Sequence, residues 1–317
     1  VSRSSALASK ASGYPIARVS AKIAVGMNLH EIQLANTPAS FEPSLDYVVT
    51  KMPRFPFDKF PAAHNTLSTQ MKATGEVMSV GRSFEESLLK AIRSLEESKN
   101  HLHMEKFDST HMSVDELLEY IKEGTDDRLY AISQLMWMGV DPSLICDITH
   151  IDMFFLDKIK KIVDFEKEME ANPGSDILLR EAKRLGFSDS YIAELWKESE
   201  GSIYERRYKE DIFPTYKMID TCASEFDSYV PYFYSTYANE NESVVSDKKK
   251  IIVLGSGPIR IGQGVEFDYS TVHAVHAIQQ LGYEAIVINN NPETVSTDYT
   301  TADKLYFEPL TTEDVMN

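Results

Sequence analysis

The chain has 317 residues, of which 43% are hydrophobic and 26% are charged, and its formal net charge is −17. This composition is that of an ordinary globular protein, and the length suggests two or three domains. A surface this acidic repels nucleic acid and anionic membranes, so we expect neither as a partner.

The two cysteines, Cys146 and Cys222, lie far apart in the sequence. They form neither a disulfide framework nor a zinc-ligand spacing, which favours a reducing, cytoplasmic location. No apolar run approaches the ~18 residues of a membrane span. The chain begins without Met and ends where a helix over 312–315 should begin. We therefore expect it to be a piece of a longer polypeptide, with some active-site residues outside it.

Residues 1 to about 96 have a mixed α and β pattern. A capping box from Ser83 to Glu86 begins an amphipathic helix that carries Leu88, Leu89 and Ile92. Apolar periodicity, prolines and glycines predict helices over 5–11 and 16–24 and strands over 45–51 and 75–81.

Residues 97 to about 246 have helical periodicity almost throughout. Ser113 to Glu116 is a second capping box, and Asp141-Pro142 places an N-cap before a first-turn proline. An aromatic run over 229–234 is compatible with a short extended segment. The remaining helices are predicted over 126–138, 154–169, 176–185 and 188–197.

Residues 247–317 begin with one strand–turn–helix–strand unit. A β-branched strand over 251–254 precedes a glycine-rich turn that contains Gly255, Gly257, Gly262 and Gly264. The helix that follows runs to 281, and a second strand over 285–289 leads into the polar loop 291–298. Ligands of parallel α/β sheets collect at the edge where both of these loops emerge.

The glycine turn allows three interpretations. Backbone N–H groups of such a turn can approach an anion at a helix N-terminus. A dinucleotide fingerprint fits only in part, because Arg260 occupies the third glycine position and Asn289, not an acid, ends the second strand. The glycines could also have a purely structural role, in which they only allow the backbone to turn.

Four charged residues are further candidates. Glu266 and Glu293 follow the two strands and could hold a cation, move a proton or line a polar passage; alternatively, water solvates both. Glu76 lies within a strand, where an acid usually faces solvent. Arg3 could bind an oxyanion or lie on the surface. The histidines suggest no Ser–His–Asp or Cys–His arrangement, and we predict no metal site.

At this point four stretches carry a specific likeness, and they resemble the large subunit of carbamoyl-phosphate synthetase. They are VSRSSALASKASGYPIA, TPASFEPSLDYVVTKMPRFPFDKF, TQMKATGEVMSVGRSFEESLLKAIRSLE and VLGSGPIRIGQGVEFDYSTVHAVHAIQQLGYEAIVINNNPETVSTDYTTADKLYFEP. The resemblance implies an α/β plus all-α architecture. It assigns the C-terminal part of a first ATP-grasp domain to 1–96, a helical oligomerisation domain to 97–246, and the Rossmann-like pre-ATP-grasp start of a second half to 247–317.

The resemblance also implies an activity for the intact protein. Such a ligase makes carbamoyl phosphate from bicarbonate, two ATP and ammonia, which a small amidotransferase subunit releases from glutamine. ATP with Mg²⁺ or Mn²⁺, and K⁺, would be its cofactors, and arginine or pyrimidine biosynthesis its pathway. The ATP and metal sites are expected outside these 317 residues, so the chain alone should be inactive. Homo-oligomers would form through 97–246, for which a plain spacer role is the alternative.

In that family, carbamate travels between two active sites through an internal passage. The resemblance places the following residues along it: Arg3, Leu45, Met71, Glu76, Gly264, Glu266 and Glu293. Gly264 would keep the bore open, and the acids would manage the charge of carbamate. Two other classes stay open at this point: a dinucleotide-binding α/β enzyme, and a helical interaction module with inert flanking segments.

Overall fold

The computed structural model describes residues 1–317 except 1–2, 35–36, 224–229 and 256–259. The helices of the described part are α1 (Arg3–Ser12), α2 (Ile16–Ala24), α3 (Phe84–Ser94), α4 (Val114–Tyr120), α5 (Arg128–Trp137), α6 (Pro142–Thr149), α7 (Met153–Ala171), α8 (Asp176–Leu185), α9 (Asp189–Trp196), α10 (Glu200–Lys209), α11 (Tyr269–Gln280) and α12 (Thr312–Met316). The strands are β1 (Val48–Arg54), β2 (Gly75–Gly81), β3 (Thr215–Met218), β4 (Tyr232–Thr236), β5 (Lys250–Leu254), β6 (Glu284–Asn289) and β7 (Lys304–Phe307).

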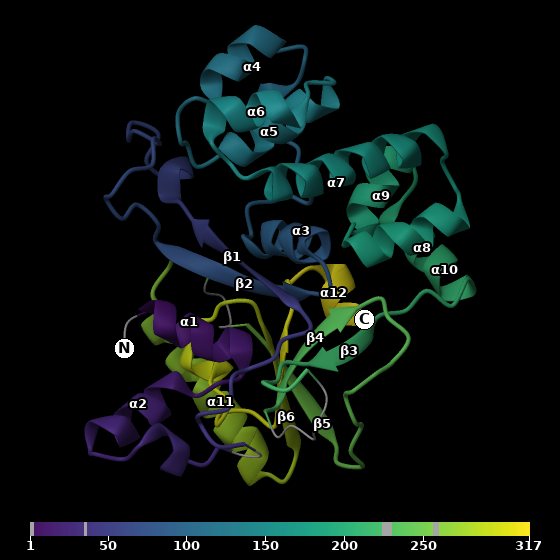
Figure 1. The fold of residues 1–317 in the computed structure, drawn as a ribbon. Helices are drawn as coiled ribbons and strands as arrows, with labels where there is room; N and C mark the ends of the chain where they lie inside the picture. Colours follow the sequence, from purple (N-terminus) through teal and green to yellow (C-terminus); the bar gives the residue numbers. More distant parts are fainter. Residues whose placement is uncertain (1–2, 35–36, 224–229, 256–259) are drawn as a thin grey trace.

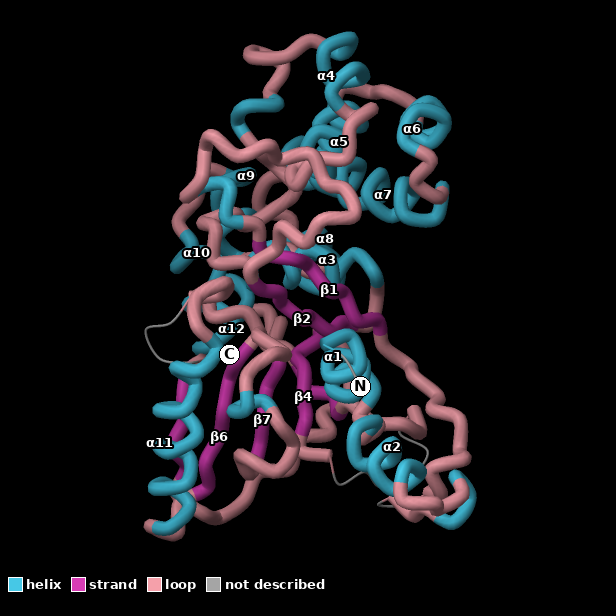
Figure 2. The backbone as a smooth tube through the Cα atoms, turned by 90° about the vertical axis from the view of Figure 1, so that its left-hand side faces the viewer, coloured by secondary structure: helices cyan, strands magenta, loops and turns pink. Residues whose placement is uncertain are grey.

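These elements form a helical region and two sheets (Figures 1 and 2). The antiparallel pair β1–β2 crosses the middle of the molecule, and helices α4 to α10 lie on one side of it. On the other side lies a five-stranded sheet of order β3-β4-β7-β6-β5, in which only β3 pairs antiparallel. The mixed α/β architecture with an added helical region is therefore confirmed.

The helical region begins its helices where the sequence predicts. At the start of α4, the Ser113 side chain accepts a hydrogen bond from the backbone N–H of Glu116, and the Glu116 carboxylate accepts one from the backbone N–H of Ser113. At the start of α6, Asp141 is the N-cap. In the 19-residue helix α7, the buried positions Leu156, Ile159 and Val163 recur at helical spacing. One continuous apolar core results, and it extends from α3 to α10.

Two strands lie inside the interval 97–246 that the sequence predicts to be helical. β4 falls in the predicted aromatic segment, whereas β3 was not predicted. Both belong to the five-stranded sheet, because Tyr232 and Phe233 of β4 pair with Leu305 and Tyr306 of β7. All five residues of β4 are buried, so this strand lacks the alternation of polar and apolar residues that marks a strand with one exposed face.

The strand before the glycine turn is less enclosed than a strand of a doubly covered sheet. β5 pairs with β6 alone and forms one edge of the sheet. Ile252 and Leu254 are consequently 52% and 47% exposed, whereas β6 is buried along its whole length. The β-branched composition predicts the strand correctly but cannot tell an edge strand from a central one.

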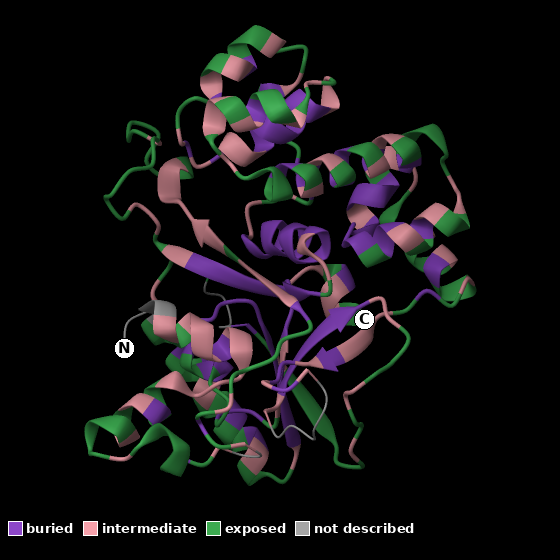
Figure 3. Ribbon diagram, in the orientation of Figure 1, coloured by how far each residue is buried: buried purple, intermediate pink, exposed green. Residues whose placement is uncertain are grey.

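Helix α3 lies at the centre of the molecule and is buried on all sides (Figure 3). The sequence predicts an amphipathic helix, and this expectation is wrong for its polar face. That face packs against β4 and the C-terminal segment, so Glu86, Lys90 and Arg93 are buried as well. Buried charges are tolerated only where they are paired or hydrogen-bonded.

Each of these charges has a partner from a distant part of the chain. Lys90 Nζ donates to the carbonyl oxygen of Ser235 at 2.6 Å and pairs with Glu308 at 3.3 Å. Arg93 donates to Gly186 O at 2.6 Å and pairs with Asp314 at 3.3 Å. Through α3, the helical region, the sheet and the C-terminal segment are therefore held together.

We predict that Glu308 makes stability depend on pH. Burial raises the pKa of Glu308 to about 7 from its ordinary 4.5. The folded state then retains a proton that the unfolded chain releases, so stability falls as pH rises from about 4.5 to 7, by up to about 3 kcal/mol. Thermal unfolding of Glu308→Gln across pH 5–8 should lack this fall, whereas the exposed control Glu105→Gln should retain it. Identical pH profiles for Glu308→Gln and the parent would contradict this assignment.

Candidate functional site

A cavity of about 360 Å³ lies where segments from the two ends of the chain meet. It brings together four of the residues that the resemblance places along a passage: Glu76, Gly264, Glu266 and Glu293. Its remaining lining residues are Ala6, Leu7, Thr74, Gln263 and Pro292. The walls thus come from α1, from β2, from the glycine turn, and from the loop after β6.

Glu76 is buried, which overturns the expectation that an acid within this strand faces solvent. Its residue is 8% exposed, and its carboxylate forms an ion pair with Lys51 of β1. The antiparallel register places Glu76 of β2 opposite Pro53 of β1. Lys51 lies on β1, two positions before Pro53. Glu76 therefore lines the cavity as one partner of a buried ion pair.

Gly264 and Glu266 form one local unit. Gly264 precedes the 3₁₀ helix η4 (Val265–Asp268), with ordinary φ and ψ angles of −68° and 119°. A Cβ atom at Gly264 would lie 2.9 Å from Oε1 of Glu266. The absence of a side chain at 264 therefore leaves room for the Glu266 carboxylate, which lies at the cavity's exposed side. This refines the expectation that Gly264 keeps the bore open.

Glu293 is held by hydrogen bonds of the asparagines that end β6. Asn289 Oδ1 accepts from the backbone N–H groups of Asn290 and Asn291 at 2.8 and 3.1 Å. Asn291 Oδ1 accepts from Glu293 N at 3.0 Å. Asparagine side chains that accept hydrogen bonds from the backbone just after them shape turns. This role explains why asparagine ends β6, at the position where a dinucleotide-binding domain would carry a ribose-binding acid.

The described glycines of the turn permit a close approach between the two ends of the chain. Gly262 has a φ of +83°, and a Cβ atom there would lie 2.6 Å from Thr74 Oγ1. A Cβ atom at Gly75 would lie 2.8 Å from Gly262 N. Gly255 has a φ of +52°, and a Cβ atom there would lie 2.7 Å from Leu310 Cδ1. These glycines therefore serve backbone conformation and packing.

The other predicted passage residues lie elsewhere or cannot be placed. Leu45 and Met71 are 46% and 78% exposed and do not line this cavity. Arg3 begins α1, but its side chain lies outside the described residues, as does all of Gly257.

The sequence analysis missed Ala6 and Leu7, although a signal exists. They follow Arg3 by three and four positions in a helix, which places them on the same face. It also missed Thr74, Gln263 and Pro292, which neighbour predicted residues in the chain but carry no pattern of their own.

Neither a metal site nor a membrane span is found in the described part of the chain. No group of three or more His, Cys, Asp and Glu residues there could hold a metal ion. The divalent ions that the resemblance implies therefore find no such cluster in the part of the chain that the structure describes. The described helices are all too short or too polar to cross a bilayer.

Family models match most of this chain. Residues 1–32 match the ATP-binding domain of the carbamoyl-phosphate synthase large chain, 76–211 its oligomerisation domain, and 247–317 its pre-ATP-grasp domain. Together the matches cover the chain except 33–75 and 212–246. The chain belongs to the carbamoyl-phosphate synthetase large-chain family.

The family matches have two direct implications for this synthetase chain. An ATP-binding domain implies ATP use by the intact protein, and an oligomerisation domain indicates interaction with other chains. The oligomerisation match begins at residue 76 and so includes β2 and α3, whereas we expected this domain to begin at 97.

We predict that Gly262→Ala destabilises the protein. The substitution forces a Cβ into a left-handed conformation and against Thr74, which should cost about 1–3 kcal/mol in the free energy of unfolding. Urea unfolding measures the effect. The control Gly201→Ala lies in helix α10 with no neighbouring atom closer than 3.9 Å, and it should stabilise by about 0.5–1 kcal/mol. Equal stability of Gly262→Ala and the parent would show that this close approach is not required.

Proposed function

We propose that this chain carries the central section of the carbamate passage in a glutamine-hydrolysing carbamoyl-phosphate synthetase. The intact ligase would phosphorylate bicarbonate with one ATP, form carbamate with ammonia from a glutamine amidotransferase subunit, and phosphorylate carbamate with a second ATP. One observation carries the proposal. A single cavity collects Glu76, Gly264, Glu266 and Glu293 from segments nearly 190 positions apart in the sequence.

The domain assignment is part of this proposal. Residues 1–96 would end the first ATP-grasp half, 97–246 would mediate oligomerisation, and 247–317 would begin the second half with a Rossmann-like unit. The strand pair β3–β4 supports a junction within the second interval, because it completes the sheet of the third. The cavity then lies between the first and third parts, where an intermediate that leaves one half for the other has to cross.

The electrostatics of the cavity suit an intermediate that must stay out of water. Carbamate is an anion, and three carboxylates around one cavity would raise its pKa and favour the neutral carbamic acid. The neutral form carries no ionic hydration shell to lose and is not held by a cationic side chain along the way. Lys51 forms an ion pair with Glu76. This pairing keeps the Lys51 ammonium group from binding carbamate.

The residues around the cavity line the route of carbamate and take no part in its phosphorylation. Glu76, Glu266 and Glu293 set the charge of the wall, and Ala6, Leu7 and Pro292 supply apolar surface that excludes water. ATP bound in the two halves would supply the phosphoryl groups. The family matches favour this function over a dinucleotide-binding enzyme, because none of the three matched domains is a dinucleotide-binding one.

We predict that Gly264→Leu uncouples the two ATP-consuming reactions of the full-length enzyme. The new side chain displaces the Glu266 carboxylate and fills the cavity, so carbamate formed in the first half should not reach the second. Bicarbonate-dependent ATP hydrolysis should persist while the yield of carbamoyl phosphate falls at least about tenfold, as a blocked path predicts. ADP and carbamoyl phosphate are measured in the same reaction.

The matched control is Gly201→Leu, which adds the same side chain to the exposed start of α10. It should leave the ratio of ADP to carbamoyl phosphate unchanged. Normal coupling in Gly264→Leu would contradict the passage.

We predict that the 317-residue protein self-associates through its helical region. Light scattering over a dilution series should show an oligomer that dissociates at low protein concentration, because association depends on mass action. A monomer at every concentration would favour the spacer role.

A further inference from the structure

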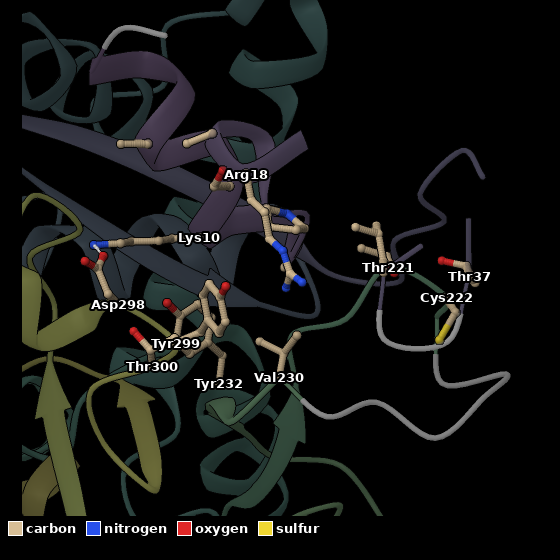
Figure 4. A pocket seen from close by; sticks show the side chains of 16 residues that line it. Lys10, Arg18, Thr37, Thr221, Cys222, Val230, Tyr232, Asp298, Tyr299 and Thr300 are labelled. Carbon is tan, nitrogen blue, oxygen red and sulfur yellow. Dashed lines mark ion pairs between the residues drawn. The ribbon is translucent and has the colours of Figure 1, made fainter. Parts of the chain in front are cut away.

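Lys10 of α1 is a buried lysine that contacts the loop 291–298, and Figure 4 shows it beside Asp298 at the end of this loop. It is 8% exposed, and it follows Ala6 and Leu7 of the cavity wall by one helical turn. Its Nζ donates to the carbonyl oxygens of Pro292 and Thr294 at 2.8 and 2.9 Å. Lys10 therefore binds the backbone on both sides of Glu293.

The same ammonium group makes two further contacts in this loop. It donates to Thr297 Oγ1 at 2.8 Å and forms an ion pair with Asp298 at 2.9 Å. Burial lowers the pKa of Lys10, while the neighbouring Asp298 opposes this shift. Pro292 is buried, and Lys10 supplies the hydrogen bond that its carbonyl oxygen accepts within the described residues. Removal of the amine would therefore leave this oxygen unpaired, whereas Thr294 O would still accept from Thr297 Oγ1 at 2.8 Å.

Other contacts of the loop come from the sheet side of the molecule. Asp268 accepts from Ser296 N at 2.6 Å, and the Tyr232 hydroxyl donates to Thr297 O at 2.5 Å. These partners belong to the same sheet unit as the loop itself. Lys10 differs from them because it belongs to α1, at the other end of the sequence.

We propose that Lys10 is a positioning residue that clamps the loop 291–298 against α1 and thereby seals the wall of the carbamate passage. This inference rests on the proposed function. With the clamp in place, Glu293 faces the cavity from a fixed backbone, and the seam between Leu7 and Pro292 is closed to water. Without it, the loop separates from α1, and carbamate that escapes reacts with water to give bicarbonate and ammonia.

Lys10→Met in the full-length enzyme tests the clamp, since methionine retains the apolar stem without the donors. Bicarbonate-dependent ATP hydrolysis and its KM for bicarbonate should stay near the parent values. The ratio of ATP hydrolysed to carbamoyl phosphate formed should rise at least about twofold, because the unpaired buried carbonyl oxygen of Pro292 and the lost ion pair with Asp298 favour the open loop. A merely structural role would lower both rates together and leave the ratio unchanged.

Two matched variants support the test. Lys10→Arg retains the charge and several donors, and it should restore part of the coupling. Lys249→Met removes an exposed lysine before β5 and should leave the ratio unchanged.

The outcomes separate the clamp from the passage. If Gly264→Leu uncouples the enzyme while Lys10→Met stays coupled, the clamp is wrong and the passage stands. If both stay coupled, the passage itself is wrong. If Lys10→Met does not fold, Asp298→Asn and Thr297→Val each remove one contact of the clamp and should give intermediate ratios; full coupling in both would overturn the inference.

Discussion

A helix that has no exposed face must place every charge that it carries against a partner, and α3 is such a helix. Glu86, Lys90 and Arg93 are all buried, and their partners come from β4, the α8–α9 turn and the C-terminal segment. Because an unpaired buried charge costs several kcal/mol, these three parts cannot separate from α3 independently. The helical region and the five-stranded sheet are thus fixed relative to each other by a helix that precedes both in the sequence.

This rigid centre explains how a cavity can form between the two ends of the chain. β2 leads directly into α3, and Met78 of β2 donates to Asn290 O at 3.0 Å, next to the Glu293 loop. Gly75 and Gly262 then allow the backbones to approach more closely than any side chain would permit. The two segments are held together by backbone contacts and by the hydrogen bonds of Lys10.

Three acids from distant segments of the chain line one cavity. Glu76 pairs with Lys51, Glu266 lies beside Gly264, and the backbone N–H of Glu293 donates to Asn291. They belong to three separate segments: β2, the 3₁₀ helix η4 and the loop after β6. If carbamate crosses this cavity, as we propose, these carboxylates would favour its neutral form.

The sequence by itself determined the local features of this protein. The bounds of β2, the caps at Ser83, Ser113 and Asp141, and the helical periodicity of α7 depend on residues within about four positions of one another, so they can be read in order. The motifs also determined the family. Only the tertiary structure decided that α3 is buried on its polar face, that β3 and β4 join the C-terminal sheet, and that Lys10 reaches a loop 282 positions away. The physical reason is that burial and pairing depend on which distant segments pack together, and no local pattern carries that information.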